Sequence, residues 1–249
     1  MPATELLPPR PTGRTFADDR VVRLADADAT GRLRLDAIAR YLQDIASDDA
    51  SDALLPNALA WVVRRTMIEV RTPAVLNERV QLVTFCTGWG RSWAERRTSI
   101  TGDGGASIEA VSLWVQVDTT TARPARLGDE FFTTWGEAAG DRRVSSKLSL
   151  PKDAPVGAAL HPWAFRMTDV DQLGHVNNAA QWSIVEEFLM AGDQPLIGRG
   201  QIEYLAPVEA GAALSLAVTG SGLWLRDDAG TQTVAAWNST ESWTAGAGG

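Results

Sequence analysis

The sequence predicts an α+β protein made of two similar halves, each a long helix wrapped by a curved antiparallel sheet. Three observations predict this. A ten-residue segment occurs twice, as RLADADATGR at 23–32 and as RMTDVDQLGH at 166–175. Each copy is followed by apolar residues at helical spacing. Each helical stretch is followed by several runs that alternate as strands do. Repetition at this scale indicates a duplicated architecture.

The helical stretches follow the repeated segments directly. In both, apolar residues recur at steps of three and four: Leu35, Ile38, Leu42 and Ile45 in the first half, and Trp182, Val185 and Leu189, with Ile184 and Phe188, in the second. So wide an apolar face is typical of a helix that packs against a sheet.

Strand-like segments come next in each half. IEVRTP at 68–73 and IEYLAP at 202–207 match each other and end at a proline, which cannot continue a central ladder. Alternation with a period of two is clear at 111–117, and the turns GDGG and DDAG separate strand pairs.

The two halves are predicted at 15–135 and 156–249. Residues 136–155 between them are polar and rich in Gly, Ser and Pro, as linkers are. One helix wrapped by a strongly curved antiparallel sheet is the hotdog arrangement. Two in tandem form a pseudo-dimer whose sheets can join edge to edge, which removes two exposed edges. We therefore expect a tandem double hotdog.

Composition excludes several classes of function. The net charge of −8 argues against nucleic-acid binding and a polybasic membrane anchor. No apolar run approaches the ~18 residues of a membrane span, and the N-terminus lacks a signal peptide, so a cytoplasmic protein is expected. Cys86 is the one cysteine and is expected to be a buried, inert thiol. Nucleophile-elbow, dinucleotide, Walker and zincin motifs are absent.

The segment TDVDQLGHVNNAAQWSIVEE at 168–187 resembles the D-x-x-G-H-V-N-N segment of hotdog thioesterases. Together with WVVRRTMIEVRTPAVLNE and GWGRSWAERRTSI in the first half, it resembles a bacterial relative of the plant-type acyl-ACP thioesterases. The resemblance implies release of fatty acid from acyl-ACP, or acyl-CoA, in fatty acid biosynthesis. It implies a catalytic motif in the second hotdog and an acyl-chain pocket in the first. Arg32, Arg34 and Leu35 replace the histidine and asparagines in the first copy.

Thioester hydrolysis needs an attacking group and a polarised carbonyl. We expect Asp171 to act as nucleophile or general base, and a backbone N–H within 175–178, at the start of the helix, to bind the thioester oxygen. The predicted catalytic residues are Asp171, His175, Asn177 and Glu187, and the predicted substrate-binding residues are Gly174, Val176 and Asn178. No cofactor or metal is expected.

Structural roles compete with these. Asp171 could only shape the loop, His175 could only pack at the helix start, and Asn178 with Gln181 imitates a capping box. The sequence also departs from the plant-type pattern, because Leu173 stands where those enzymes carry asparagine, and Pro207 and Val208 stand where they carry an acidic residue and a cysteine.

Two other functions remain open: a thioesterase for an aromatic or polyketide-like acyl-CoA, and a non-catalytic acyl-binding or acyl-sensing protein. The expected partner is acyl carrier protein or a CoA thioester, and a homodimer is compatible with the fold. An acidic carrier would need a basic patch, for which the candidates are Arg91, Arg96, Arg97, Arg142 and Arg143.

Overall fold

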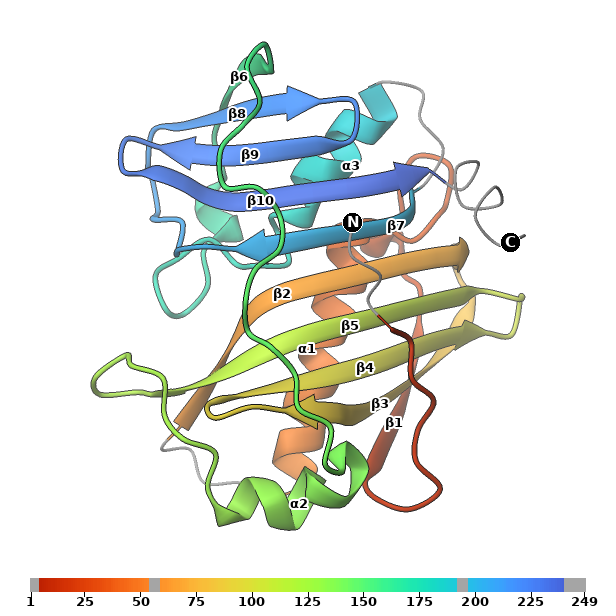
Figure 1. Ribbon diagram of the computed structural model, residues 1–249. Coiled ribbons are helices and arrows are strands. Elements are labelled where there is room, and N and C mark those ends of the chain that lie inside the picture. Colours follow the sequence, from red (N-terminus) through yellow and green to blue (C-terminus); the bar gives the residue numbers. More distant parts are fainter. Residues whose placement is uncertain (1–4, 54–58, 192–196, 240–249) are drawn as a thin grey trace, which may run out of the picture.

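The chain forms one ten-stranded antiparallel sheet in the order β1-β3-β4-β5-β2-β7-β10-β9-β8-β6 (Figure 1). The computed structural model describes residues 5–53, 59–191 and 197–239. The first five strands in this order come from the first half of the chain and the last five from the second. The predicted fold class, a tandem double hotdog, is confirmed.

In its described residues the first half contains five strands, two helices and a short 3-10 turn: β1 (Thr15–Val21), η1 (Leu24–Asp26), α1 (Leu35–Asp52), β2 (Leu59–Thr72), β3 (Arg79–Trp89), β4 (Trp93–Gly102), β5 (Ser107–Asp118) and α2 (Asp129–Ala139). The second half repeats the plan with a shorter helix: β6 (Ala159–Trp163), η2 (Met167–Asp169), α3 (Trp182–Ala191), β7 (Ile197–Tyr204), β8 (Leu214–Thr219), β9 (Gly222–Asp227) and β10 (Gly230–Ser239).

The two halves join where β2 pairs with β7. Thr66 lies opposite Ile202, and Ile68 lies opposite Gly200. In the aligned segments Ile68 corresponds to Ile202, and Thr66 corresponds to Gly200. Exchanging the two halves therefore converts one of these pairings into the other. Such reciprocity defines a two-fold relation, as at the interface of a symmetric dimer. The junction is therefore a pseudo-two-fold axis between the halves.

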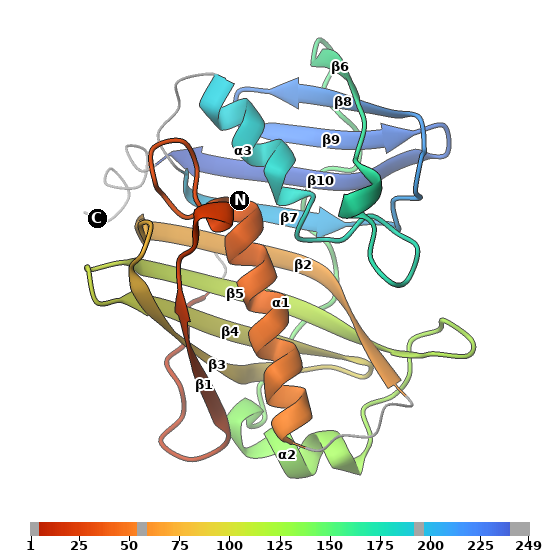
Figure 2. The same ribbon diagram turned by 180° about the vertical axis from the view of Figure 1, so that it is seen from behind.

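Helices α1 and α3 lie on the same face of the sheet, where they contact each other (Figure 2). The predicted apolar positions of both helices are buried, except that Phe188 is partly buried. Leu35, Ile38, Ile45 and Trp182 are fully enclosed. Burying one such side chain contributes about 1.5–3 kcal/mol, so this shared core is the main stabilising contact of the helices. In the described part of the chain, no helix combines the length and apolar character required to cross a bilayer.

The segment predicted as a linker, 136–155, differs from expectation in two ways. Helix α2, which the sequence reading missed, occupies its first residues as far as Ala139. The rest crosses the outer face of the sheet, opposite α1 (Figure 1), and is bonded to it. The fully buried Glu203 carboxylate accepts the N–H groups of Ser149 and Leu150 at 2.8 and 3.0 Å. Trp224 donates its indole N–H to the Pro151 carbonyl at 2.7 Å.

Candidate active site

The two copies of the repeated segment fold into the same loop. The N–H of Asp171 donates to the His175 carbonyl at 2.9 Å, and that of Asp28 donates to the Arg32 carbonyl at 2.8 Å. Each loop turns at a glycine with positive φ, Gly174 at 81° and Gly31 at 84°. The backbone conformation there favours glycine, which explains why both copies contain one.

Asp171 lies within the second loop. Its Oδ1 accepts the backbone N–H of Leu173 at 2.9 Å, a bond that fixes the carboxylate over the turn. Asn177 lines the same cavity as Asp171. It is fixed by two hydrogen bonds, because its N–H donates to the Asp169 carbonyl at 2.8 Å and its Oδ1 accepts the N–H of Ala179 at 2.8 Å. The loop therefore presents two oxygen-bearing side chains from fixed backbone.

The helix after this loop starts later than expected. We predicted a helix start at 175–178, but α3 begins at Trp182 and residues 178–181 form turns. The proposed capping box between Asn178 and Gln181 is not formed, because Gln181 accepts the hydroxyl of Thr233 at 2.6 Å. In the first half the helix starts directly at Leu35. The backbone N–H of Asn178 donates to no group in the described part of the chain.

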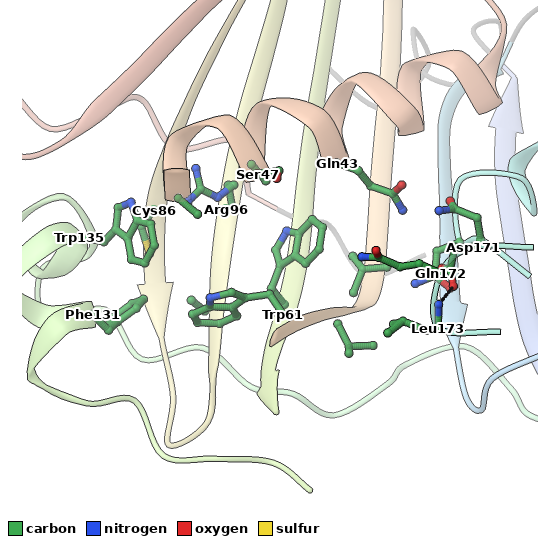
Figure 3. A pocket seen from close by; sticks show the side chains of 18 residues that line it. Gln43, Ser47, Trp61, Cys86, Arg96, Phe131, Trp135, Asp171, Gln172 and Leu173 are labelled. Carbon is green, nitrogen blue, oxygen red and sulfur yellow. Dashed lines mark hydrogen bonds between the residues drawn. The ribbon is translucent and has the colours of Figure 1, made fainter. Parts of the chain in front are cut away.

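A cavity of about 400 Å³ begins at this loop and runs under α1 into the first half (Figure 3). Asp171, Asn177 and Asn178 line one end, together with the exposed residues Gln172 and Leu173. The first half lines the remainder with a face of small and polar residues on α1 and with sheet and α2 side chains: Gln43, Ala46, Ser47, Ala50, Trp61, Val62, Val63, Cys86, Ala94, Arg96, Trp114, Phe131 and Trp135. This volume lies within the range of small-molecule sites.

The far end of the cavity is closed by buried aromatic rings and an ion-pair cluster. Phe131 and Trp135 of α2 pack at a ring separation of 5.6 Å. Asp49, 1% exposed, accepts the Trp135 indole N–H at 2.9 Å and pairs with Arg96 at 2.7 Å and Arg14 at 2.6 Å. The cavity thus has one open, polar end at Asp171 and one closed end at α2.

The equivalent place in the first loop is filled. Glu186 of α3 is buried, and its Oε2 accepts the backbone N–H of Leu35 at 2.7 Å. Burial raises the pKa of the Glu186 carboxyl to about 7. The first loop therefore holds an internal carboxylate where the second loop opens onto the cavity.

The predicted site residues divide into two groups. Asp171, Asn177 and Asn178 line the cavity, whereas Gly174, His175 and Val176 do not. The imidazole of His175 contacts Glu209, with Nε2 3.4 Å from Oε1. The hydrogen bond between His175 and Asp171 uses the His175 backbone carbonyl. Val176 is buried and its N–H donates to the Val208 carbonyl at 2.9 Å.

Glu187 does not share this cavity. It is exposed on α3, whereas its neighbour Glu186 is the buried carboxylate. Within the described residues, no three His, Cys, Asp or Glu side chains are grouped so as to hold a metal ion.

The arginines considered for a docking patch are mostly engaged inside the fold. Arg96 pairs with Asp49, Arg97 with Glu109 at 2.8 Å, and Arg142 with Glu95 at 2.5 Å. Three of the five candidates are therefore neutralised by partners that are themselves almost fully buried. Arg91 and Arg143 are exposed, and a basic patch that includes them stays a prediction.

Cys86 behaves as expected. It is 3% exposed, and burial raises the pKa of its thiol to about 11, so the reactive thiolate is scarce at neutral pH. Although the thiol lines the cavity, it is unsuited to act as a nucleophile.

The sequence implied a pocket in the first half but did not identify the residues that line it. Trp61, Trp114, Phe131 and Trp135 carried no motif, and only the excess of tryptophan, ten in the chain, could have drawn attention to them. Gln43 was missed too, although the repeat offset was the available signal. Gln43 and Glu186 are 143 residues apart (186 − 43), as are Leu35 and Asn178 (178 − 35).

Comparisons with known proteins agree with this architecture. Residues 13–135 match the family model of the acyl-ACP thioesterase N-terminal domain. The uncharacterized protein Rv2001 from Mycobacterium tuberculosis is 30% identical over 195 residues, which cover 77% of each chain. The chain belongs to the acyl-ACP thioesterase family.

Solved structures share the fold. The 12:0-ACP thioesterase from Umbellularia californica aligns with a TM-score of 0.73 and 20% identity, covering 90% of this chain and 97% of that one. An acyl-ACP thioesterase from Bacteroides thetaiotaomicron aligns with a TM-score of 0.72 and 18% identity, covering 90% and 96%.

Proposed function

We propose that the protein hydrolyses acyl thioesters and releases a fatty acid from acyl-ACP, with acyl-CoA as the alternative donor. One observation carries the proposal: a single cavity joins Asp171, Asn177 and Asn178 to the aromatic lining of the first half. Such a cavity suits an acyl chain lying among apolar side chains with its thioester at the polar end. The family membership supports the same reaction.

Asp171 is the group that starts the reaction. Its carboxylate takes a proton from a water molecule, and the water oxygen bonds to the thioester carbon while the carbonyl electron pair moves onto oxygen. When that pair returns, the C–S bond breaks, the thiolate leaves, and Asp171 returns the proton to it. The products are the carboxylic acid and the free thiol. Asn177, fixed beside Asp171, is placed to hold the water.

The backbone N–H of Asn178 is the donor that stabilises the oxyanion. Leu35 occupies the corresponding position in the first repeat, and its N–H binds a carboxylate oxygen of Glu186 at 2.7 Å. This contact supports an oxygen-binding role for this position of the loop. Preorganised donors of this kind contribute about 10²–10³ in turnover each. His175 and Gly174 act on the loop's shape, since their contacts are with Glu209 and with the turn.

The test compares wild type with Asp171→Asn on a panel of acyl thioesters. Wild type should turn over long-chain acyl-ACP or acyl-CoA, and the variant should lose about 10²-fold or more of kcat with an unchanged melting temperature. Equal activity of the two proteins would disprove the site. If wild type binds acyl chains but releases no acid, the protein is an acyl-binding protein instead.

A second candidate substrate is favoured by the lining itself. Four aromatic side chains, Trp61, Trp114, Phe131 and Trp135, border the cavity, and aromatic rings pack well against one another. A thioesterase for an aromatic acyl-CoA would use the same Asp171 chemistry. Including benzoyl- and phenylacetyl-CoA in the panel separates the two, because the fatty-acyl proposal requires the straight chains to have the higher kcat/KM.

A further inference from the structure

Helix α3 contacts the loop of the first half, and the pseudo-two-fold axis relates this contact to a corresponding place in the second half. Glu186 of α3 reaches Leu35, the residue with which α1 begins. In the other repeat, Gln43 occupies the position that corresponds to Glu186, and Asn178 occupies the position that corresponds to Leu35. A two-fold relation brings corresponding pairs of residues to corresponding places, and here it is approximate because α3 begins later than α1. This relation predicts that Gln43 on α1 lies near the backbone of Asn178.

Two further observations support that placement. Gln43 and Asn178 line the same cavity, together with Asp171 and Asn177. Figure 3 shows the Gln43 side chain extending from α1 toward the end of the cavity that holds Asp171 and Gln172. The side-chain amide of Gln43 makes no hydrogen bond to any residue in the described ranges. The two N–H groups of the Gln43 amide are therefore available to a ligand at the place where the thioester is expected.

We propose that Gln43 belongs to the active site and donates a hydrogen bond from its side-chain amide to the thioester carbonyl oxygen, beside the N–H of Asn178. The proposal rests on the thioesterase function argued above. It makes the oxyanion site a joint product of both halves, with one backbone donor from the second and one side-chain donor from the first.

The exchange of glutamate for glutamine between the two contacts has a chemical reason. A carboxylate can only accept when ionised, so at position 186 it binds the Leu35 N–H and fills the site. An amide carries two N–H donors and no charge. At position 43 it can leave the Asn178 N–H open and add a donor for the negative charge that develops on the carbonyl oxygen. A carboxylate there would instead occupy the N–H and repel both that charge and Asp171.

Three variants of the full-length chain test the proposal against hexadecanoyl- and decanoyl-CoA and the matching acyl-ACP. Gln43→Met keeps the length of the side chain and removes its donors. It should lower kcat about 10²-fold and change KM by less than about threefold, as expected for a donor used in the transition state. The matched control is Gln81→Met, the same substitution at an exposed position of β3 outside the cavity, which should stay within about threefold of wild type.

The third variant, Gln43→Glu, gives a readout that a purely structural role would not produce. Its carboxylate should dock on the Asn178 N–H and inhibit at pH 8. Protonation should release the N–H, so the activity of the variant relative to wild type should rise about tenfold between pH 8 and pH 5. The charged groups that share the cavity with position 43 are Asp171 and Arg96, and both are present in the two proteins. The ratio to wild type therefore removes the pH dependence that the two enzymes have in common.

Several results would overturn the proposal. A Gln43→Met enzyme as active as the Gln81→Met control would do so. A defect confined to KM, or a Gln43→Glu activity ratio that does not change with pH, would do so too. If wild type is active and Asp171→Asn inactive while Gln43→Met is normal, only this inference fails. If wild type hydrolyses none of the thioesters, the proposed function fails and this proposal with it.

Discussion

Replacing Glu186 by glutamine should make the protein's stability less dependent on pH. Glu186 is buried between the helices, and its carboxylate accepts the Leu35 N–H, with Arg34, Asp36 and Asp28 as the nearest charged groups. Its Oε1 has no hydrogen-bond partner among the described residues. Burial raises its pKa from 4.5 to about 7, so the native protein holds a proton that the unfolded chain has already lost.

The direction and size of the effect follow from linkage. Because the native state binds more protons between pH 4.5 and 7, the free energy of unfolding falls as pH rises through that window and is level above it. Each pKa unit corresponds to ~1.4 kcal/mol. Between pH 5 and pH 8 the wild type should therefore lose about 2–3 kcal/mol through this residue alone. Glutamine can still accept the Leu35 N–H but does not titrate.

Urea unfolding of wild type and Glu186→Gln at several pH values from 5 to 8 measures this. The difference in unfolding free energy between variant and wild type should grow in the variant's favour by about 2–3 kcal/mol across the range. Any pH-independent effect of the substitution cancels in that comparison. A difference that stays constant with pH would refute the reasoning, and activity should change little because Glu186 lies outside the cavity.

Three further predictions concern the cavity and its supports. Asp49→Asn should lower the free energy of unfolding by about 3 kcal/mol in urea, because it leaves Arg96 without its buried partner; a loss below about 1 kcal/mol would contradict this. Gly174→Ala and the corresponding Gly31→Ala should each lower the free energy of unfolding by about 1–2 kcal/mol, because both glycines have positive φ. Only Gly174→Ala should lower thioesterase activity, and equal activities of the two variants would argue against a single active loop. Ala46→Leu should fill the cavity and reduce kcat/KM for hexadecanoyl relative to decanoyl thioester by roughly tenfold, and an unchanged chain-length profile would place the acyl chain elsewhere.

The fold was predictable because the duplication can be recognised from local sequence patterns. The repeated segments at 23–32 and 166–175 predict two equal turns, and the structure forms both with the same backbone hydrogen bonds and a positive-φ glycine in each. The apolar spacing of the helices and the matched proline-ended strands depend only on local periodicity. Such features survive in the sequence because each residue's neighbours along the chain largely determine them.

Other features depend on contacts between distant residues, and the sequence did not reveal them. Helix α3 begins at Trp182 because Gln181 and Asn177 are engaged by Thr233 and by the loop, which no capping pattern shows. The arginines of β4 appeared available for a surface patch, yet their partners Asp49 and Glu109 lie on other elements. Charge pairing across a sheet is set by register, and spacing along one strand does not contain it.

The number of active sites per chain depends both on local sequence patterns and on contacts between distant residues. The replacement of histidine by Arg32 indicates that the first loop is inactive, but His175 itself is not among the residues that line the cavity, and its imidazole contacts Glu209. The stronger physical difference is on the opposite helix, where Glu186 fills the first loop's oxygen-binding N–H while Gln43 leaves the second one open. The functional distinction between the halves therefore depends on the residue that each helix presents to the other half's loop, and it is visible only once the pseudo-two-fold axis pairs position 43 with position 186.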